Sequence, residues 1–228
     1  MTRLVLALLA LTTPFAARGD VWSYEDKDGV VHFTNIPPRG KNAHLWRVVY
    51  RTGPGKAQTV SAVLRGAAGP SSYPGCRESR ADVVPATDRS PDRYVRYDAY
   101  IAEAAATYSL PEPLIRAIIK AESDYDPRVV SCAGARGLMQ IMPDVEREQH
   151  IRDVFDPRDN ILGGSRLLRI LANRFKGDLV LTIAGYHAGA GAVLKYGGVP
   201  PYETTQAYVR TVLRHYQRYK EKARLASL

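Results

Sequence analysis

The sequence from residue 114 to residue 143 reads LIRAIIKAESDYDPRVVSCAGARGLMQIMP, and its pattern of apolar and polar residues is the clearest structural signal in the chain. The first third of this stretch repeats apolar residues at intervals of three and four, which predicts an amphipathic helix. The inner stripe of this helix comprises Leu114, Ile115, Ile118 and Ile119. Glu122 falls on the same stripe, because it follows Ile118 by four positions and Ile119 by three. The helix therefore points the carboxyl group of Glu122 toward the interior.

Glu122 also lies in the last turn of this predicted helix, since Pro127 follows soon after it. Burial and the negative end of the helix dipole both oppose ionisation, so the pKa of Glu122 is expected to be raised. A carboxylic acid that stays protonated near neutral pH is what a general acid requires. The helix alone favours a structural alternative, a buried Glu paired with Arg or Lys. The nearby Asp124 and Asp126 are expected to be solvated or to form caps.

The length and charge of the chain set broad limits on its class. A chain of 228 residues with 45% apolar residues can hold one domain and a smaller module. The formal charge of +9 predicts attraction to an anionic partner. Nucleic acid, an acidic membrane surface and a carboxylate-rich polymer all fit this charge, and the charge does not choose among them.

Residues 1–19 have the pattern of a secretory signal peptide. A basic start, Met1–Arg3, precedes an apolar run, Leu4–Leu11, that is too short to span a bilayer. Cleavage is expected after Gly19, with cleavage after Ala17 as a close alternative. No cysteine lies near either point, so a lipid anchor is not expected, and no other apolar run is long enough to span a bilayer. The mature protein is therefore expected to be exported and soluble, without stable membrane insertion.

Export bears on the two cysteines of the chain, Cys76 and Cys132. An oxidising compartment permits a disulfide between them. The alternative is that Cys132 is a small buried residue and Cys76 a linker residue that never meets it. The sequence leaves these two possibilities equal, because it does not give the distance between the two Cα atoms.

Residues 20–51 are expected to form a small β module. The runs Val21–Glu25 and Val30–Thr34 are rich in β-branched and aromatic residues, and the Asp-Gly pair between them is a hairpin signal. A third strand is expected within Leu45–Tyr50. The arrangement resembles a small uncharacterised module found at the start of secreted bacterial proteins, and this resemblance implies no chemistry.

Residues 52–92 are rich in Gly, Pro, Ser, Ala and Arg, and we expect a linker there because such a segment buries too little apolar surface to fold. A mainly α-helical domain is expected over residues 93–228. Its expected helices cover residues 94–108, 112–122, 157–176 and 179–186, the last capped by Asp178, and a final helix begins near Glu203.

The segment Gly185–Gly191 contains three glycines around Tyr186 and His187. Glycines at this density predict a close backbone approach or positive φ angles. An irregular backbone is therefore expected there in place of a regular helix.

Four segments in order carry a family resemblance: Glu122-Ser123, the GLMQ at residues 137–140, the GYHAG at residues 185–189, and Glu203-Thr204 followed by Tyr208-Val209. Together they resemble the lysozyme-like catalytic domain of the soluble lytic transglycosylases, over roughly residues 94–219. One such tetrapeptide is weak evidence, but the ordered series is specific. It reverses the balance at Glu122 in favour of a catalytic role.

The resemblance implies cleavage of the MurNAc–GlcNAc β-1,4 bond of peptidoglycan, with no cofactor and no metal. Glu122 would protonate the leaving glycosidic oxygen and then, as a base, accept the proton of the MurNAc 6-hydroxyl group. That hydroxyl attacks the anomeric carbon of its own sugar, which yields a 1,6-anhydro product and consumes no water. The implied partner is the peptidoglycan glycan strand.

The resemblance also implies roles for residues around Glu122. Ser123 and Gln140 match positions that hydrogen-bond the substrate, and Met139 matches one that packs against a sugar, with ordinary core packing as an equal alternative. Tyr186 and Tyr208 match tyrosines that line the cleft and orient the acid.

Two further positions carry open alternatives. Glu203 matches a buried Glu near the cleft, and a capping residue at the start of the last helix is at least as good an interpretation. His187 stands where the family commonly has Asn. It can still hydrogen-bond, and it can also become charged in mildly acidic conditions.

Other functions on the same fold stay open at this point, namely a hydrolytic lysozyme and a non-catalytic peptidoglycan-binding accessory protein. Nucleic-acid binding conflicts with the export signal. The basic face of the last helix is expected to be solvated or to steer the protein toward acidic peptide stems; it comprises Arg210, Arg214, Arg218 and Lys220. The expected location is the periplasm or cell envelope. Envelope or secretion-system partners, and endo against exo cleavage, are left open.

Overall fold

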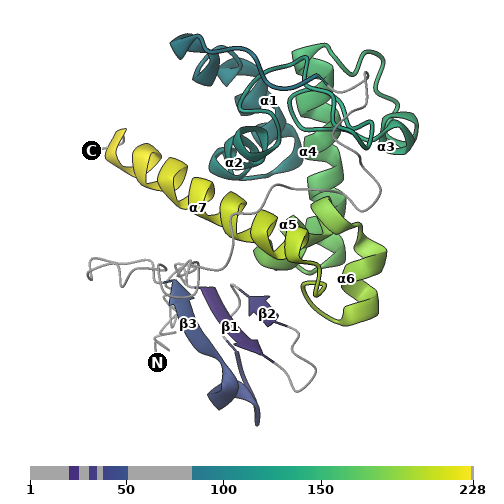
Figure 1. The fold of residues 1–228 in the computed structure, drawn as a ribbon. Helices are drawn as coiled ribbons and strands as arrows, with labels where there is room; N and C mark the ends of the chain where they lie inside the picture. The colour runs from purple at the N-terminus through teal and green to yellow at the C-terminus, as the bar shows by residue number, and fades with distance from the viewer. Residues whose placement is uncertain (1–20, 26–30, 35–37, 51–83, 227–228) are drawn as a thin grey trace, which may run out of the picture.

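The computed structural model describes residues 21–25, 31–34, 38–50 and 84–226 (Figure 1). The predicted signal peptide, the turn of the predicted hairpin, most of the predicted linker and Cys76 lie outside these residues. Cys132 is disulfide-bonded.

The region from residue 91 onward is helical, as predicted (Figure 1). Its elements are the 3-10 helix η3 (Pro91–Tyr94) and the helices α1 (Asp98–Tyr108), α2 (Glu112–Glu122), α3 (Pro143–Glu148), α4 (Pro157–Arg174), α5 (Leu179–Ala188), α6 (Ala190–Tyr196) and α7 (Glu203–Ala226). Among the residues described, no helix combines the length and the apolar character that crossing a membrane requires.

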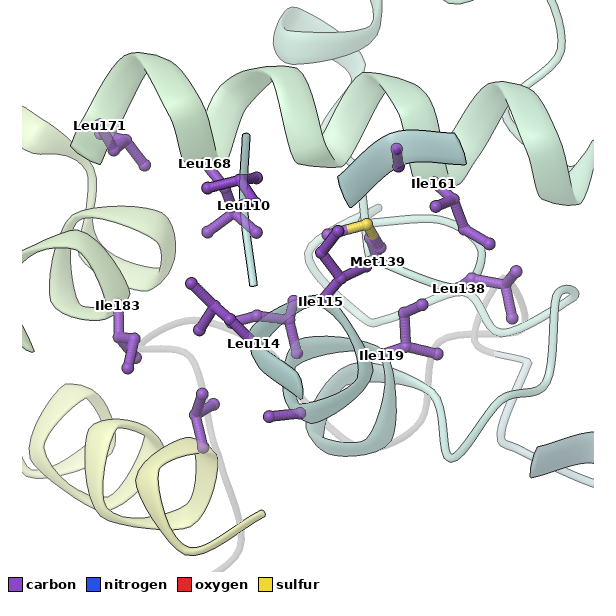
Figure 2. Packing of buried hydrophobic residues seen from close by; sticks show 14 of the residues in the cluster. Leu110, Leu114, Ile115, Ile119, Leu138, Met139, Ile161, Leu168, Leu171 and Ile183 are labelled. Atoms are coloured by element: carbon purple, nitrogen blue, oxygen red, sulfur yellow. The ribbon is translucent and has the colours of Figure 1, made fainter. Parts of the chain in front are cut away.

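The longer helices form a closed cycle of contacts that encloses the core. α7 packs against α2 and α5, α1 packs against α2 and α4, and α4 packs against α5. The predicted inner stripe of α2 is buried, with Ile115, Ile118 and Ile119 completely closed to solvent. Each such side chain stabilises the fold by about 1.5–3 kcal/mol. Figure 2 shows residues of α2, α4 and α5 meeting in this core.

The helix ends follow from their capping residues. Asp178 accepts hydrogen bonds from the amides of Val180 and Leu181, both at 3.0 Å, and so caps α5 as predicted. Asp156 caps α4 in the same way by accepting from the Asp159 amide at 2.8 Å.

The prediction of an irregular backbone around Gly185 is wrong, because α5 runs through this residue to Ala188. Gly185 is needed for a close approach, since a Cβ atom there would lie 2.7 Å from Cε2 of Phe175. The predicted positive φ angle occurs at Gly189, where α5 ends and α6 follows. The sequence pattern did not predict α6.

The N-terminal module contains a three-stranded antiparallel sheet, in the order β2-β1-β3. β1 covers Val21–Glu25, β2 covers Val31–Thr34 and β3 covers Arg47–Tyr50. The third strand lies within the predicted range, and a 3-10 helix, η1 (Ala43–Leu45), precedes it. The module approaches the helical region where β2 contacts α5.

The boundary predicted at residue 92 needs correction. Val84 and Val130 exchange backbone hydrogen bonds of 2.9 Å, and the Thr87 amide donates to Oδ2 of Asp126 at 2.7 Å. Residues 84–92 were predicted to belong to the linker, but these contacts place them against the helical region.

Candidate active site

Glu122 is the last residue of α2, and the raised pKa of its carboxyl group makes it the candidate for acid catalysis. The residue is partly exposed, but protein atoms surround its carboxyl group. Burial raises the pKa of Glu122 to about 7, against an opposing influence from a hydrogen bond with Tyr208. The predicted rise in pKa therefore has burial as its main cause.

Tyr208 reaches Glu122 from α7, and its hydroxyl group donates a hydrogen bond to Oε1 of the carboxyl group. The packing of α7 on α2 brings these two residues together across a separation of 86 positions. The bond favours the ionised carboxylate, but burial outweighs it. Tyr208 therefore holds the carboxyl group in place without forcing it to ionise.

Tyr186 comes from α5 and lies within the electrostatic reach of Glu122. Burial and the negative charge of Glu122 raise the pKa of Tyr186 well above its usual value. Its hydroxyl group donates to the carbonyl oxygen of Met139 at 2.8 Å. Tyr186 therefore remains a neutral donor that ties α5 to the loop carrying residues 137–140.

That loop is held by Asn160 of α4. The Asn160 side chain accepts from the Met139 amide at 2.8 Å and donates to the Val154 carbonyl oxygen at 2.7 Å. Gly137 has a φ of +76°, and a Cβ atom there would lie 2.3 Å from Nδ2 of Asn160. The loop therefore requires glycine at this position. The sequence analysis does not identify Asn160 as a site residue, although its place beside Ile161 on the inner stripe of this helix is a signal that could have identified it.

Two of the predicted substrate contacts are engaged inside the protein. Ser123 is only 3% exposed, and its hydroxyl lies 2.8 Å from the carbonyl oxygen of Leu138. Met139 is 0% exposed, and a Cβ atom on Gly164 would lie 2.6 Å from its sulfur. The predicted packing of Met139 against a sugar is therefore wrong for this structure, and core packing is correct (Figure 2). Ser123 joins the end of α2 to the loop.

Gln140 is partly exposed and has a positive φ of 51°. Its side-chain nitrogen donates to the carbonyl oxygens of Val129 and Gly137, both at 3.0 Å. Within the described part of the chain, no donor is bonded to its side-chain oxygen. The amide is thus held by its nitrogen, and the oxygen is left to accept a further hydrogen bond.

His187 follows Tyr186 on α5 and packs against the other tyrosine. Its ring lies 4.6 Å from the Tyr208 ring, centroid to centroid, at an interplanar angle of 32°. Its Nδ1 lies 3.1 Å from the hydroxyl oxygen of Thr205. Burial lowers the pKa of His187, which opposes the charging considered from the sequence. Thr205 was missed, although it shares the inner stripe of α7 with Tyr208 and Val209.

Glu203 does not lie where the resemblance implied. It is exposed in the first turn of α7, so the expectation of a buried Glu near the cleft is wrong. An acidic residue in the first turn interacts favourably with the helix dipole, which agrees with the alternative interpretation.

The two other carboxyl groups near Glu122 have fixed partners. Asp124 pairs with Lys120 and Arg93, which hold its pKa below the usual range. Asp126 accepts hydrogen bonds from three backbone amides and also has a lowered pKa. Over the residues described, no cluster of three or more His, Cys, Asp or Glu side chains could hold a metal ion.

Comparison with known families divides the chain into two matched regions. Residues 99–208 match the transglycosylase SLT domain, and residues 6–62 match a domain of unknown function, DUF4124. The second match agrees with the uncharacterised module that the N-terminal sequence resembles.

Several curated relatives are similar to the helical region. The chain is 38% identical over 89 residues to the transglycosylase of Enterobacteria phage PRD1, which covers 39% of this chain and 33% of the relative. It is 28% identical over 140 residues to membrane-bound lytic murein transglycosylase C of Mannheimia succiniciproducens, covering 54% of this chain and 38% of the relative. The chain thus spans well under half the length of these relatives.

Solved structures agree with the sequence comparison. An inactive Glu-to-Gln mutant of the lytic transglycosylase Slt from Pseudomonas aeruginosa aligns with a TM-score of 0.53 and 27% identity, over 57% of this chain and 25% of that one. The 70-kDa soluble lytic transglycosylase in complex with bulgecin A aligns with a TM-score of 0.51 and 28% identity, over 56% and 25%. The predicted lysozyme-like helical fold is confirmed.

Proposed function

We propose that this chain cleaves the MurNAc–GlcNAc β-1,4 bond of peptidoglycan without water and leaves 1,6-anhydroMurNAc ends, because residues 99–208 match the transglycosylase SLT domain. Relatives of the helical region are named lytic murein transglycosylases, which supports this substrate. The observation that carries the proposal is Glu122, a carboxyl group with a pKa of about 7 held by Tyr208.

Glu122 acts first as an acid in this proposal. Its carboxyl proton passes to the glycosidic oxygen as the bond between this oxygen and the anomeric carbon breaks, while positive charge develops on the MurNAc ring. The carboxylate then accepts the proton of the 6-hydroxyl group, and the 6-oxygen bonds to the anomeric carbon. The carboxyl group is protonated again at the end of the cycle.

A single carboxylate fits this chemistry better than the usual pair. Glycosidases that employ two carboxylates use the second as a nucleophile or to activate water. Here Asp124 is bound by Lys120 and Arg93, and Asp126 by backbone amides. Glu203 is exposed in the first turn of α7. With Asp124 and Asp126 engaged in other contacts and Glu203 exposed at the start of α7, the nucleophile is assigned to the substrate.

The residues around Glu122 take supporting roles. Tyr208 orients the carboxyl group and stabilises its ionised state after proton transfer, since its hydroxyl already donates to Oε1. Tyr186 and His187 line the same side of the site from α5, and the free side-chain oxygen of Gln140 accepts a hydrogen bond from the glycan. Ser123 positions the end of α2 through the Leu138 carbonyl.

We place this activity in the cell envelope. The pattern of residues 1–19 supports export, and the positive charge of the chain favours an acidic polymer as partner. The segment that matches DUF4124 adds no chemistry to the proposal.

Product analysis tests the proposal. Purified sacculi are digested with the wild type and with Glu122→Gln, and the released muropeptides are separated and weighed by mass spectrometry. Anhydro-muropeptides are expected from the wild type, with a fall of about 10²–10⁴-fold in the mutant. Reducing ends would indicate a hydrolase, and equal degradation by both proteins would end the catalytic role of Glu122. The structure of an inactive Glu-to-Gln mutant of a relative supports the choice of this substitution.

A further inference from the structure

The segment Val84–Arg96 precedes the matched transglycosylase SLT domain and lies against the turn that follows Glu122. We infer that this segment, here called the clamp, positions the carboxyl group of Glu122 for catalysis, a role that rests on the proposed function of that residue. The clamp includes η3 and makes contacts with the backbone and the side chains of the turn.

The turn has a backbone that needs outside support. Asp124 and Tyr125 have φ angles of 50° and 70°, so two successive residues with side chains occupy the left-handed region. Residues other than glycine enter this region at a cost and stay there when their surroundings hold them. The turn begins immediately after the catalytic helix ends, because Ser123 is the C-cap of α2.

The first anchor of the clamp is Asp124. Arg93 is 8% exposed, and its guanidinium donates to the Asp124 carbonyl oxygen at 3.2 Å and to Oδ2 at 3.0 Å. Tyr94 donates its hydroxyl to Oδ1 of the same carboxylate at 3.2 Å. Two consecutive residues of the clamp thus hold both the main chain and the side chain of Asp124.

The second anchor is Asp126, which is 4% exposed. Its Oδ2 accepts from the amides of Thr87 at 2.7 Å and Asp88 at 3.1 Å. The backbone bridge between Val84 and Val130 continues this contact beyond the turn. The clamp therefore binds the turn through the carboxylates of both Asp124 and Asp126.

The clamp reaches the catalytic helix through Lys120, in the last turn of α2. Lys120 pairs with Asp124, and its Nζ lies 3.0 Å from the Tyr94 hydroxyl. The final turn of α2 is thus held by the clamp through Lys120 and by α7 through the bond between Tyr208 and Glu122. A displacement of about 1 Å in a catalytic group can cost about 10²-fold in rate, so small movements of this turn matter.

The first arm of the test compares Arg93→Met with Arg116→Met. Arg116 is a matched control, because its side chain is 17% exposed, lies on α2 and bonds two carboxylates, Asp98 at 2.5 Å and Glu112 at 3.3 Å. The kcat, KM and Tm of each full-length variant are measured on soluble glycan strands. We expect Arg93→Met to lower kcat about tenfold or more with KM unchanged within about twofold. Arg116→Met should lower Tm and leave kcat unchanged.

The second arm measures the pKa of Glu122 by NMR titration of its labelled side-chain carboxyl carbon. Loss of a nearby cation by itself raises the pKa of a carboxyl group, whereas loosening of the turn exposes Glu122 to water and lowers it. We expect the pKa to fall in Arg93→Met and in the milder Tyr94→Phe, and to recover in Arg93→Lys. Tyr94→Phe serves if Arg93→Met does not fold.

The two arms separate the clamp from the proposed function. A wild type that releases no product ends the proposed function, while the titration still reports whether the clamp controls the surroundings of Glu122. Equal kcat values in Arg93→Met and Arg116→Met, or a pKa that stays constant or rises in both clamp variants, overturn the clamp.

Discussion

Two carboxyl groups, those of Glu122 and Asp124, lie two positions apart at the end of α2 and behave in opposite ways. Burial disfavours the charged form of both. Glu122 has a tyrosine hydroxyl as its partner, and its pKa rises to about 7. Asp124 has Lys120 and Arg93 as partners, and its pKa falls below the usual range. Burial keeps the proton on Glu122 against the opposing effect of Tyr208, whereas at Asp124 the two cations outweigh burial and favour the ionised form.

The contrast assigns different work to the two residues. A neutral donor such as Tyr208 steadies a carboxyl group in either protonation state, so the proton can leave and return. Two cations hold an aspartate in its ionised state, so its proton is not available near neutral pH. Glu122 is thereby suited to proton transfer, and Asp124 to holding the structure around it.

The largest effect is expected when the side chain of Glu122 is shortened. Glu122→Asp keeps the carboxyl group but withdraws it by one methylene, which removes it from Tyr208 and from the glycosidic oxygen. We expect kcat for anhydro-muropeptide release to fall about 10²-fold, because a misplacement of about 1 Å has this effect. Glu112→Asp, in the first turn of the same helix, is the control and should retain activity. Near-normal turnover by Glu122→Asp would contradict the assigned geometry.

A second prediction removes the neutral partner. In Tyr208→Phe the ionised form of Glu122 loses its hydrogen bond, so the pKa of Glu122 should rise further above 7. Because the acid must be protonated for the first step, activity in the wild type falls as the pH rises through about 7. The mutant should therefore move this alkaline limb to higher pH.

At its optimal pH, Tyr208→Phe should have a kcat about 10- to 100-fold lower than the wild type, since a hydrogen bond to a charged group contributes about 1.5–3 kcal/mol. A pH–rate profile of kcat on soluble glycan strands gives both quantities. An alkaline limb that stays in place or moves to lower pH would show that Tyr208 does not act on Glu122 as described.

A third prediction concerns stability, where the two acids should give changes of opposite sign. The folded pKa of Glu122 is raised from 4.5 to about 7, so its contribution to stability is complete below pH 4.5 and is lost as the pH rises toward 7. Gln does not ionise. Glu122→Gln should therefore be more stable than the wild type above pH 7, by about 2–3 kcal/mol, and equally stable near pH 4.

Asp124→Asn should destabilise the protein instead. The pKa of Asp124 is lowered from 3.8, so its stabilising effect is present above pH 3.8 and disappears as the pH falls through the folded value. We expect a loss of about 1–3 kcal/mol near neutral pH, because two cations lose their partner. Urea unfolding of both mutants from pH 4 to pH 8 measures these effects. If both mutations changed the free energy of unfolding in the same direction at pH 8, the opposite roles assigned to Glu122 and Asp124 would be wrong.

The smallest effect is expected from charges remote from both acids. Arg214 and Arg218 are exposed on α7, on the face opposite its buried stripe. The double mutant Arg214→Glu, Arg218→Glu should lower kcat/KM on sacculi a few-fold at low salt, with kcat unchanged, because exposed charges steer an anionic polymer. Raising the salt concentration should remove the difference. A change in kcat would mean that this face acts on the site itself.

Much of the helical fold was predictable, because its signals are local. The apolar intervals in α2 and α7 and the capping residue Asp178 identify helices without any knowledge of distant contacts. The prediction at Gly185 failed because glycine is required there by the close approach of the Phe175 ring. That approach comes from tertiary packing, which the residues next to Gly185 do not indicate. The contacts of residues 84–92 were also missed. The composition of this segment is that of a linker, and its partners, Asp126 and Val130, lie about 40 positions later in the chain.

Local sequence patterns and the ordered motifs were enough to identify Glu122 as the candidate for the proposed chemistry. The helical period and the early stop at Pro127 place Glu122 at the inner end of a helix, and these are properties of neighbouring positions. The tertiary structure alone decided its partners. It brought Tyr208 to the carboxyl group across 86 positions, buried Met139 in the core, exposed Glu203 and set Arg93 on the turn. Proton affinity depends on atoms within a few ångströms, and only the folded chain determines which atoms those are.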